Sequence, residues 1–174
     1  AVQGRPIING QPDTDPAHDA VVALTFGQYM CSGTLISPEV VLTAAHCADG
    51  FGPASYTVYF GDELAGAATR RVSEVRVHPA YSASTITNDI ALLRLATPAP
   101  ASVRPIPYLP RALAIEEPDV GRPLEYVGFG ETERSQTGVK LTVTNALDWI
   151  CTRPGGCTVG SGYHASQNTI CGDQ

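Results

Sequence analysis

Short runs of β-branched and aromatic residues, separated by Pro, Gly, Asp and Ser, are the feature of this sequence that most constrains its fold. Such runs are too short for ordinary helices, and their composition is typical of strands in a sandwich or barrel. In the first half of the chain they occupy residues 21–26, 33–37, 56–61, 72–77 and 90–95. We therefore predict an all-β protein.

The second half of the chain carries fewer strand signals. Residues 97–110 hold five prolines, and because proline cannot donate to a strand ladder, this segment is predicted to be an extended linker. Two further runs follow, at residues 123–130 and 139–150. In the second of them, Leu141 and Val143 alternate with polar residues, which predicts a half-buried strand. Those polar residues are Lys140, Thr142 and Thr144. So few strands cannot close a barrel without leaving an exposed edge.

Composition excludes several classes of function. The 174 residues carry a formal net charge of -6, which argues against nucleic-acid binding because phosphate contacts need a basic surface. No apolar run approaches the roughly 18 residues that a membrane span needs, so we expect no membrane association. Five cysteines without a CxxC pair favour disulfides and an oxidising compartment. We therefore expect a secreted, extracellular or periplasmic protein. The first ten residues lack a charged segment followed by an apolar one, so we expect that any signal peptide has already been removed.

The segment "VVLTAAHCADG", residues 40–50, carries the first candidate for chemistry. An apolar strand ends in small residues and then presents His46, with Cys47 next to it and Cys31 sixteen residues before Cys47. A Cys31–Cys47 bridge would hold the histidine backbone against the neighbouring strand. Two other interpretations of His46 are a hydrogen-bonded core histidine and a zinc ligand beside Cys47, although no spacing supplies the remaining zinc ligands.

Asp89 is the second candidate, in "TNDIALLRL" directly before an apolar run. A carboxylate next to buried residues is costly unless hydrogen bonds reach it. One interpretation is a turn residue that caps the loop together with Asn88. The other is a carboxylate that accepts a hydrogen bond from an imidazole N–H, fixing the ring tautomer and stabilising the imidazolium formed in proton transfer.

Six segments occur in the order and rough spacing found in trypsin-like (chymotrypsin-fold) serine proteases, and the chain resembles this family from Ile7 onward. They are "IING", "CSGTLIS", "LTAAHC", "VHPAYS", "NDIALLRL" and "VGFG". The resemblance implies two six-stranded β-barrels with the active site between them, the first complete here and the second incomplete. It implies a residual pro-segment at residues 1–6, the first barrel with its linker at 7–108 and part of the second at 109–174.

The same resemblance implies a serine endopeptidase that needs no cofactor. His46 would be the general base and Asp89 its orienting partner. Its partners would be polypeptide substrates and protein inhibitors.

The family's nucleophile lies in a Gly-Asp-Ser-Gly-Gly block, and this sequence contains no such block. Ser161, flanked by glycines, is the best internal substitute, but it lacks the preceding aspartate. The segment "ICGDQ" is similar to the approach to the block, so we expect the serine beyond Gln174, on a C-terminal fragment or a second chain. The 174 residues alone should then be inactive. The alternative is a catalytically inactive binding module of the same fold, with Gln174 in place of the serine.

The resemblance also leaves open points at both ends of the chain. Cys157 pairs either with Cys171, leaving Cys151 over, or with Cys151, leaving Cys171 for an absent segment. Six residues ending in Arg5-Pro6 precede Ile7, and because an Arg–Pro bond resists trypsin-like cleavage, we expect an unactivated zymogen form.

Two weaker expectations concern acidic residues. Asp62, Glu63 and Glu74 fall near the region where some relatives bind calcium, but such a site needs six or more converging oxygens. Asp173 is a candidate for the substrate-specificity pocket.

Overall fold

A computed structural model describes residues 10–130, 138–147, 149–151 and 169–171 of the chain. These residues divide into two compact units. The first contains the described residues up to Tyr108 together with those of Val127–Thr142, and the second contains Leu109–Tyr126 and the described residues from Val143 onward.

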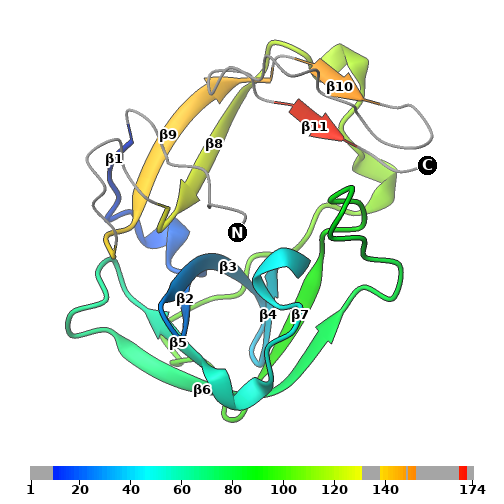
Figure 1. Ribbon diagram of the computed structural model, residues 1–174. Helices are drawn as coiled ribbons and strands as arrows, with labels where there is room; N and C mark the ends of the chain where they lie inside the picture. The colour runs from blue at the N-terminus through cyan, green and yellow to red at the C-terminus, as the bar shows by residue number, and fades with distance from the viewer. Residues whose placement is uncertain (1–9, 131–137, 148, 152–168, 172–174) are drawn as a thin grey trace. The chain divides into compact units, whose positions relative to one another are not determined.

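The first unit holds a closed barrel in which six antiparallel strands follow the order β2-β3-β4-β7-β6-β5 (Figure 1). The strands are β2 (Val21–Phe26), β3 (Tyr29–Ser37), β4 (Val40–Thr43), β5 (Tyr56–Phe60), β6 (Ala68–Val77) and β7 (Ala91–Leu95). Closure removes every free strand edge from this sheet. The all-β prediction and the complete first barrel are confirmed.

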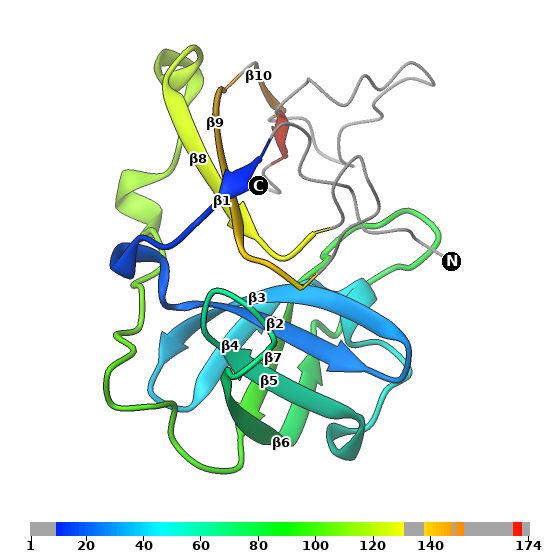
Figure 2. The ribbon, with the colours of Figure 1, turned by 90° about the vertical axis from the view of Figure 1, so that its left-hand side faces the viewer.

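The remaining strands form two small sheets. Strands β1 (Gln11–Pro12), β9 (Leu141–Ala146) and β8 (Pro123–Gly128) form one sheet with β9 in the middle, and β8 and β9 run side by side in both views (Figures 1 and 2). Strands β10 (Trp149–Cys151) and β11 (Thr169–Cys171) form a parallel pair. Among the described residues these strands do not close a second barrel. This agrees with the prediction that the second barrel is incomplete in this chain.

The helical elements of the described residues are short 3-10 turns. They are η1 (Pro16–His18), η2 (Ala45–Cys47), η3 (Pro53–Ser55), η4 (Arg111–Leu113) and η5 (Glu117–Asp119). None of the helices in the part of the chain that the structure describes is long and apolar enough to cross a membrane.

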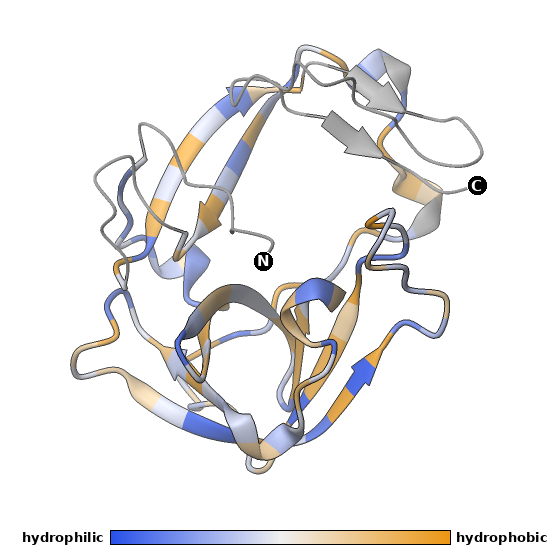
Figure 3. Ribbon diagram, in the orientation of Figure 1, coloured by the Kyte–Doolittle hydropathy of each residue, from blue (hydrophilic) through white to orange (hydrophobic). Residues whose placement is uncertain are grey.

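The barrel interior is filled by alternate residues of its strands. In β5 and β7 every second residue is buried, the period expected of a strand with one face towards a core. Figure 3 shows bands of orange and blue along parts of the ribbon, where hydrophobic and hydrophilic residues follow one another. The largest buried side chains of this core come from five of the six strands, β2, β3, β4, β5 and β7: Val22, Leu24, Leu35, Val41, Tyr56, Val58 and Leu93.

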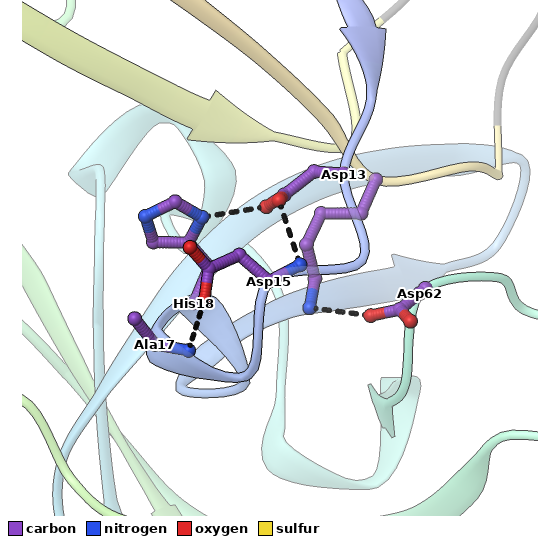
Figure 4. Close-up of polar contacts among 6 residues, drawn as sticks. Asp13, Asp15, Ala17, His18 and Asp62 are labelled. Carbon is purple, nitrogen blue, oxygen red and sulfur yellow. Dashed lines mark hydrogen bonds and ion pairs between the residues drawn. The ribbon is translucent and has the colours of Figure 1, made fainter.

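Lys140 departs from the predicted pattern, which placed it on the polar side of a strand. Strand β9 begins one residue later, and the Lys140 side chain is fully buried. Its Nζ donates to Asp62 Oδ1 at 2.9 Å, and its backbone N–H donates to the Asp62 carbonyl at 2.7 Å. The Lys140 carbonyl accepts from Asp13 N–H at 2.9 Å, and Figure 4 shows the surroundings of Asp13 and Asp62. The prediction failed because an ion pair compensates the burial of the ammonium group.

Candidate active site

His46 lies in η2, immediately after β4 ends at Thr43. The turn is closed by backbone hydrogen bonds from Cys47 N–H to the Ala44 carbonyl and from Ala48 N–H to the Ala45 carbonyl. No more than 1% of the surface of Ala45 or Ala48 is exposed, so the turn packs closely on the barrel. The small residues before the histidine therefore fix where its backbone can lie.

Two contacts hold the residue that follows His46. A disulfide joins Cys47 to Cys31 of β3, with 6.4 Å between the two Cα atoms, and this confirms the predicted bridge. The buried Tyr56 hydroxyl donates to the Cys47 carbonyl at 2.8 Å. Burial raises the pKa of Tyr56 to about 12, so the phenol remains a donor throughout the neutral range.

The zinc interpretation of His46 does not fit this arrangement. Ligand atoms of Cys31, His46 and Cys47 lie within 4.8 Å of one another. Zinc binds cysteine as a thiolate, however, and here the sulfurs of Cys31 and Cys47 are joined in a disulfide. The sulfurs of the oxidised protein therefore offer no thiolate ligand.

Asp89 lies two residues before β7, the strand that pairs with β4 in the barrel. Its Oδ2 lies 2.7 Å from His46 Nδ1, and its Oδ1 accepts from the His46 backbone N–H at 2.8 Å. The two side chains are 27% and 20% exposed, so the pair is half-buried. One carboxylate thus fixes both the ring and the backbone of the histidine.

This geometry determines the tautomer of the neutral imidazole. A carboxylate only accepts hydrogen bonds, so Nδ1 carries the proton and Nε2 carries the lone pair. Within the described part of the chain, no hydrogen bond reaches Nε2. The arrangement can therefore take up a proton at Nε2 while the carboxylate stabilises the resulting charge.

The negative charge of the Asp89 carboxylate also acts on a third side chain, that of Tyr81. Tyr81 packs against a buried cluster of Ala45, Ala48 and Ala91. Its pKa is raised by desolvation first, and then by the negative charges of Asp89 and Asp49. The negative charges of Asp89 and Asp49 therefore both disfavour ionisation of the Tyr81 phenol.

The acidic residues considered for calcium do not converge. Asp62 pairs with Lys140, and Glu74 pairs with Arg76 and Arg94 on the barrel. Among the residues that the structure describes, these acids form no cluster of metal ligands.

Several other predicted residues lie outside the described residues: Ser161, Cys157, Asp173, Gln174 and residues 1–6. The backbones of Cys151 and Cys171 are paired in register in β10 and β11. Both predicted pairings of Cys157 stay predictions.

The left-handed backbone of two residues near Asp89 was missed by sequence reasoning. Ile86 and Asn88 both have φ of 52°, in the left-handed region that few residues other than glycine adopt. Asparagine tolerates this conformation, so Asn88 gave a weak signal. The isoleucine at position 86 gave no signal for this conformation.

A six-stranded antiparallel barrel that carries a histidine–aspartate pair corresponds to the chymotrypsin-like β-barrel class of serine proteases. The model of the Trypsin family matches residues 7–174. The chain belongs to this family.

Individual relatives agree with this assignment. The chain is 34% identical over 128 residues to a trypsin of Sarcophaga bullata, covering 71% of this chain and 49% of that protein. It is 36% identical over 167 residues to kallikrein 1-related peptidase b3 of Mus musculus, covering 84% of this chain and 58% of that protein. The chain thus spans about half the length of the curated relatives it matches.

The fold is shared with solved structures. The crystal structure of the scabies mite inactivated protease paralogue S-D1 matches with a TM-score of 0.72 at 18% identity. The match covers 82% of this chain and 64% of that one. At this identity the likeness shows the fold alone.

Proposed function

We propose that this chain is the part of a serine endopeptidase that supplies the general base and its orienting carboxylate. The observation that carries the proposal is the 2.7 Å contact between His46 Nδ1 and Asp89 Oδ2, which leaves Nε2 available as a base. The substrates are polypeptides, as family membership suggests.

The reaction follows from the pair and a serine hydroxyl. Nε2 of His46 takes the hydroxyl proton as the serine oxygen attacks the peptide carbonyl, and Asp89 stabilises the imidazolium. The imidazolium then protonates the leaving amine, and an acyl-enzyme remains. A water molecule attacks this ester with Nε2 again as the base, which releases the product and restores the serine.

The serine is proposed to lie on a segment outside the 174 residues, either C-terminal to them or on a second chain. The sequence lacks a Gly-Asp-Ser-Gly-Gly block, and the chain spans about half the length of its relatives. On this proposal the 174 residues alone do not hydrolyse peptides. The Cys31–Cys47 disulfide supports an extracellular location, where such bonds persist, and protein inhibitors are proposed partners.

Labelling with a serine-directed phosphonate tests this proposal. The gene is read past the codon for Gln174. The protein including the following segment is cleaved before Ile7, treated with the phosphonate and mapped by mass spectrometry. We expect one labelled serine, in a Gly-Asp-Ser-Gly-Gly block, and no labelling of the 174-residue chain. Labelling at Ser161, or a stop codon after Gln174 with no second chain, would contradict the proposal.

The alternative is an inactive binding module on the same fold. A binding module has no chemical need for an imidazole held by a carboxylate, and the intact His46–Asp89 contacts therefore favour the enzyme. A complete protein that has been cleaved before Ile7 and carries the serine, but still resists the phosphonate, would favour the binding module.

A further inference from the structure

We propose that Asn88 is a positioning residue that sets the direction of the Asp89 carboxylate. The inference rests on the proposed function, since the direction of this carboxylate matters to catalysis only if His46 is the base. It starts from the backbone of Asn88, whose φ of 52° lies in the left-handed region directly before Asp89.

The backbone around Asp89 forms a narrow turn. The Ile90 N–H donates to the Asn88 carbonyl at 2.8 Å, so the two neighbours of Asp89 are hydrogen-bonded across it. The Ile90 carbonyl accepts from His78 N–H at 3.0 Å, just beyond the β6–β7 pairing of Val77 with Ala91. The C-terminal side of the turn is therefore fixed by the barrel.

The N-terminal side of the turn is fixed by the Asn88 side chain. Its Nδ2 donates to the Ala80 carbonyl at 2.9 Å, which ties the turn to the other end of the 78–90 loop. Ala80 is itself held, because its N–H donates to His78 Nδ1 at 3.2 Å. One asparagine thus provides both the left-handed backbone and the amide that anchors it.

Ile86 has the left-handed backbone of Asn88 without its anchoring side-chain amide. It has the same φ of 52° and is 44% exposed, but its side chain has no hydrogen-bonding group. A β-branched residue in this conformation is strained. Relieving the strain at Ile86 changes the loop without removing the Asn88 amide, which makes Ile86 the matched control.

The experiment measures the His46 Nδ1 proton by NMR in the 174-residue chain. This proton lies in the hydrogen bond to Asp89, and its exchange with water reports how often that bond opens. Three variants are compared with the wild type: Asn88→Ala, Asn88→Gly and Ile86→Gly. Glycine at position 88 keeps the left-handed backbone but lacks the amide, whereas alanine loses both. Thermal unfolding of each variant separates loss of fold from loss of the local contact.

We expect Asn88→Ala to exchange this proton about tenfold faster, the factor expected when one ordering hydrogen bond is lost. Asn88→Gly should show a smaller increase and Ile86→Gly none. If the His46 Nδ1 proton of Asn88→Gly exchanged at the wild-type rate, the role of the Asn88 amide would be overturned. This comparison holds even if Asn88→Ala does not fold. Equal acceleration in all three variants would overturn the assignment to Asn88. The measurement needs no nucleophile, so failed phosphonate labelling would count against the proposed function and not against this inference.

Discussion

At the scale of single residues, the Asp89 carboxylate has two acceptor oxygens and a different task for each. Oδ1 holds the backbone of His46 at 2.8 Å, and Oδ2 holds its ring at 2.7 Å. The ring can then rotate little without losing a charge-assisted hydrogen bond, which is about twice as strong as a neutral one. The carboxylate therefore serves both orientation and electrostatics.

Replacing Asp89 by asparagine separates these tasks. An amide NH2 that faces Nδ1 forces that nitrogen to accept, which moves the ring proton to Nε2 and abolishes the base. In a protein that carries the proposed serine, we expect kcat of Asp89→Asn to fall about 10⁴-fold with little change in KM. Steady-state kinetics on a peptide substrate measure this. A kcat within about tenfold of the wild type would show that Asp89 does not set the tautomer.

Tyr56 gives a pH-dependent prediction. Its pKa is about 12 in the folded chain, against an ordinary value of 10.0. Below pH 10 the phenol is protonated in both states. Between about pH 10 and 12 only the unfolded chain loses this proton, so the free energy of unfolding falls with rising pH.

Tyr56→Phe removes that loss. The variant also leaves the Cys47 carbonyl without its donor, which should cost about 1–2 kcal/mol at pH 8. We expect this difference from the wild type to shrink as the pH rises from 10 to 12, measured by urea unfolding. The exposed Tyr108→Phe is the control. A difference that stays constant with pH would contradict the account.

At the scale of elements, the runs of β-branched and aromatic residues predicted where barrel strands lie, but not where every strand begins. β2, β5 and β7 match the predicted runs to within one residue. β6 begins at Ala68, four residues before the predicted run, because Arg70 and Arg71 pair with β5. Polar residues at a strand start carry little signal, since pairing with a neighbour decides the strand's length.

Gly33 shows why one position between β2 and β4 must be small. A Cβ atom there would lie 2.6 Å from Val41 Cγ1 and 3.2 Å from the Leu42 carbonyl oxygen. Because valine has little rotamer freedom, we expect Gly33→Ala to destabilise the fold by about 1–3 kcal/mol. Chemical denaturation measures this. Gly52→Ala is the matched control, because nothing lies within 4 Å of the added atom. Equal stability of the two variants would contradict the packing argument.

The candidate site was predictable from sequence only in part. His46, Asp89 and the Cys31–Cys47 bridge stand in short, distinctive segments. The left-handed turn at Asn88 depends on the path of the 78–90 loop, which no local pattern encodes. The burial of Lys140 depends on Asp62, 78 residues away. Long-range polar pairs of this kind leave no periodicity to read.

At the scale of the whole molecule, the Lys140–Asp62 pair joins residues of Val127–Thr142 to the barrel within the first unit. The two partners differ in exposure: the lysine side chain is 0% exposed and the aspartate 39%. Water can solvate the carboxylate if it is left alone, but it cannot reach the ammonium.

Single substitutions of Asp62 and Lys140 should therefore lower the free energy of unfolding by different amounts. Asp62→Asn leaves a buried charge unpaired and should destabilise by about 2–3 kcal/mol, below the cost for a pair with both partners buried. Lys140→Met keeps an apolar stem of similar length and should cost less than about 1 kcal/mol. Urea unfolding of both variants tests this. The opposite order would show that the ammonium is solvated in the folded chain.

The account of the molecule as a protease depends on His46 acting as the base. The most direct test is the second-order rate of phosphonate labelling for the wild type and His46→Ala, in the protein extended through the proposed serine. Without Nε2 to take the hydroxyl proton, we predict that labelling of His46→Ala slows by at least about 10³-fold. Labelling at the wild-type rate would contradict the central claim.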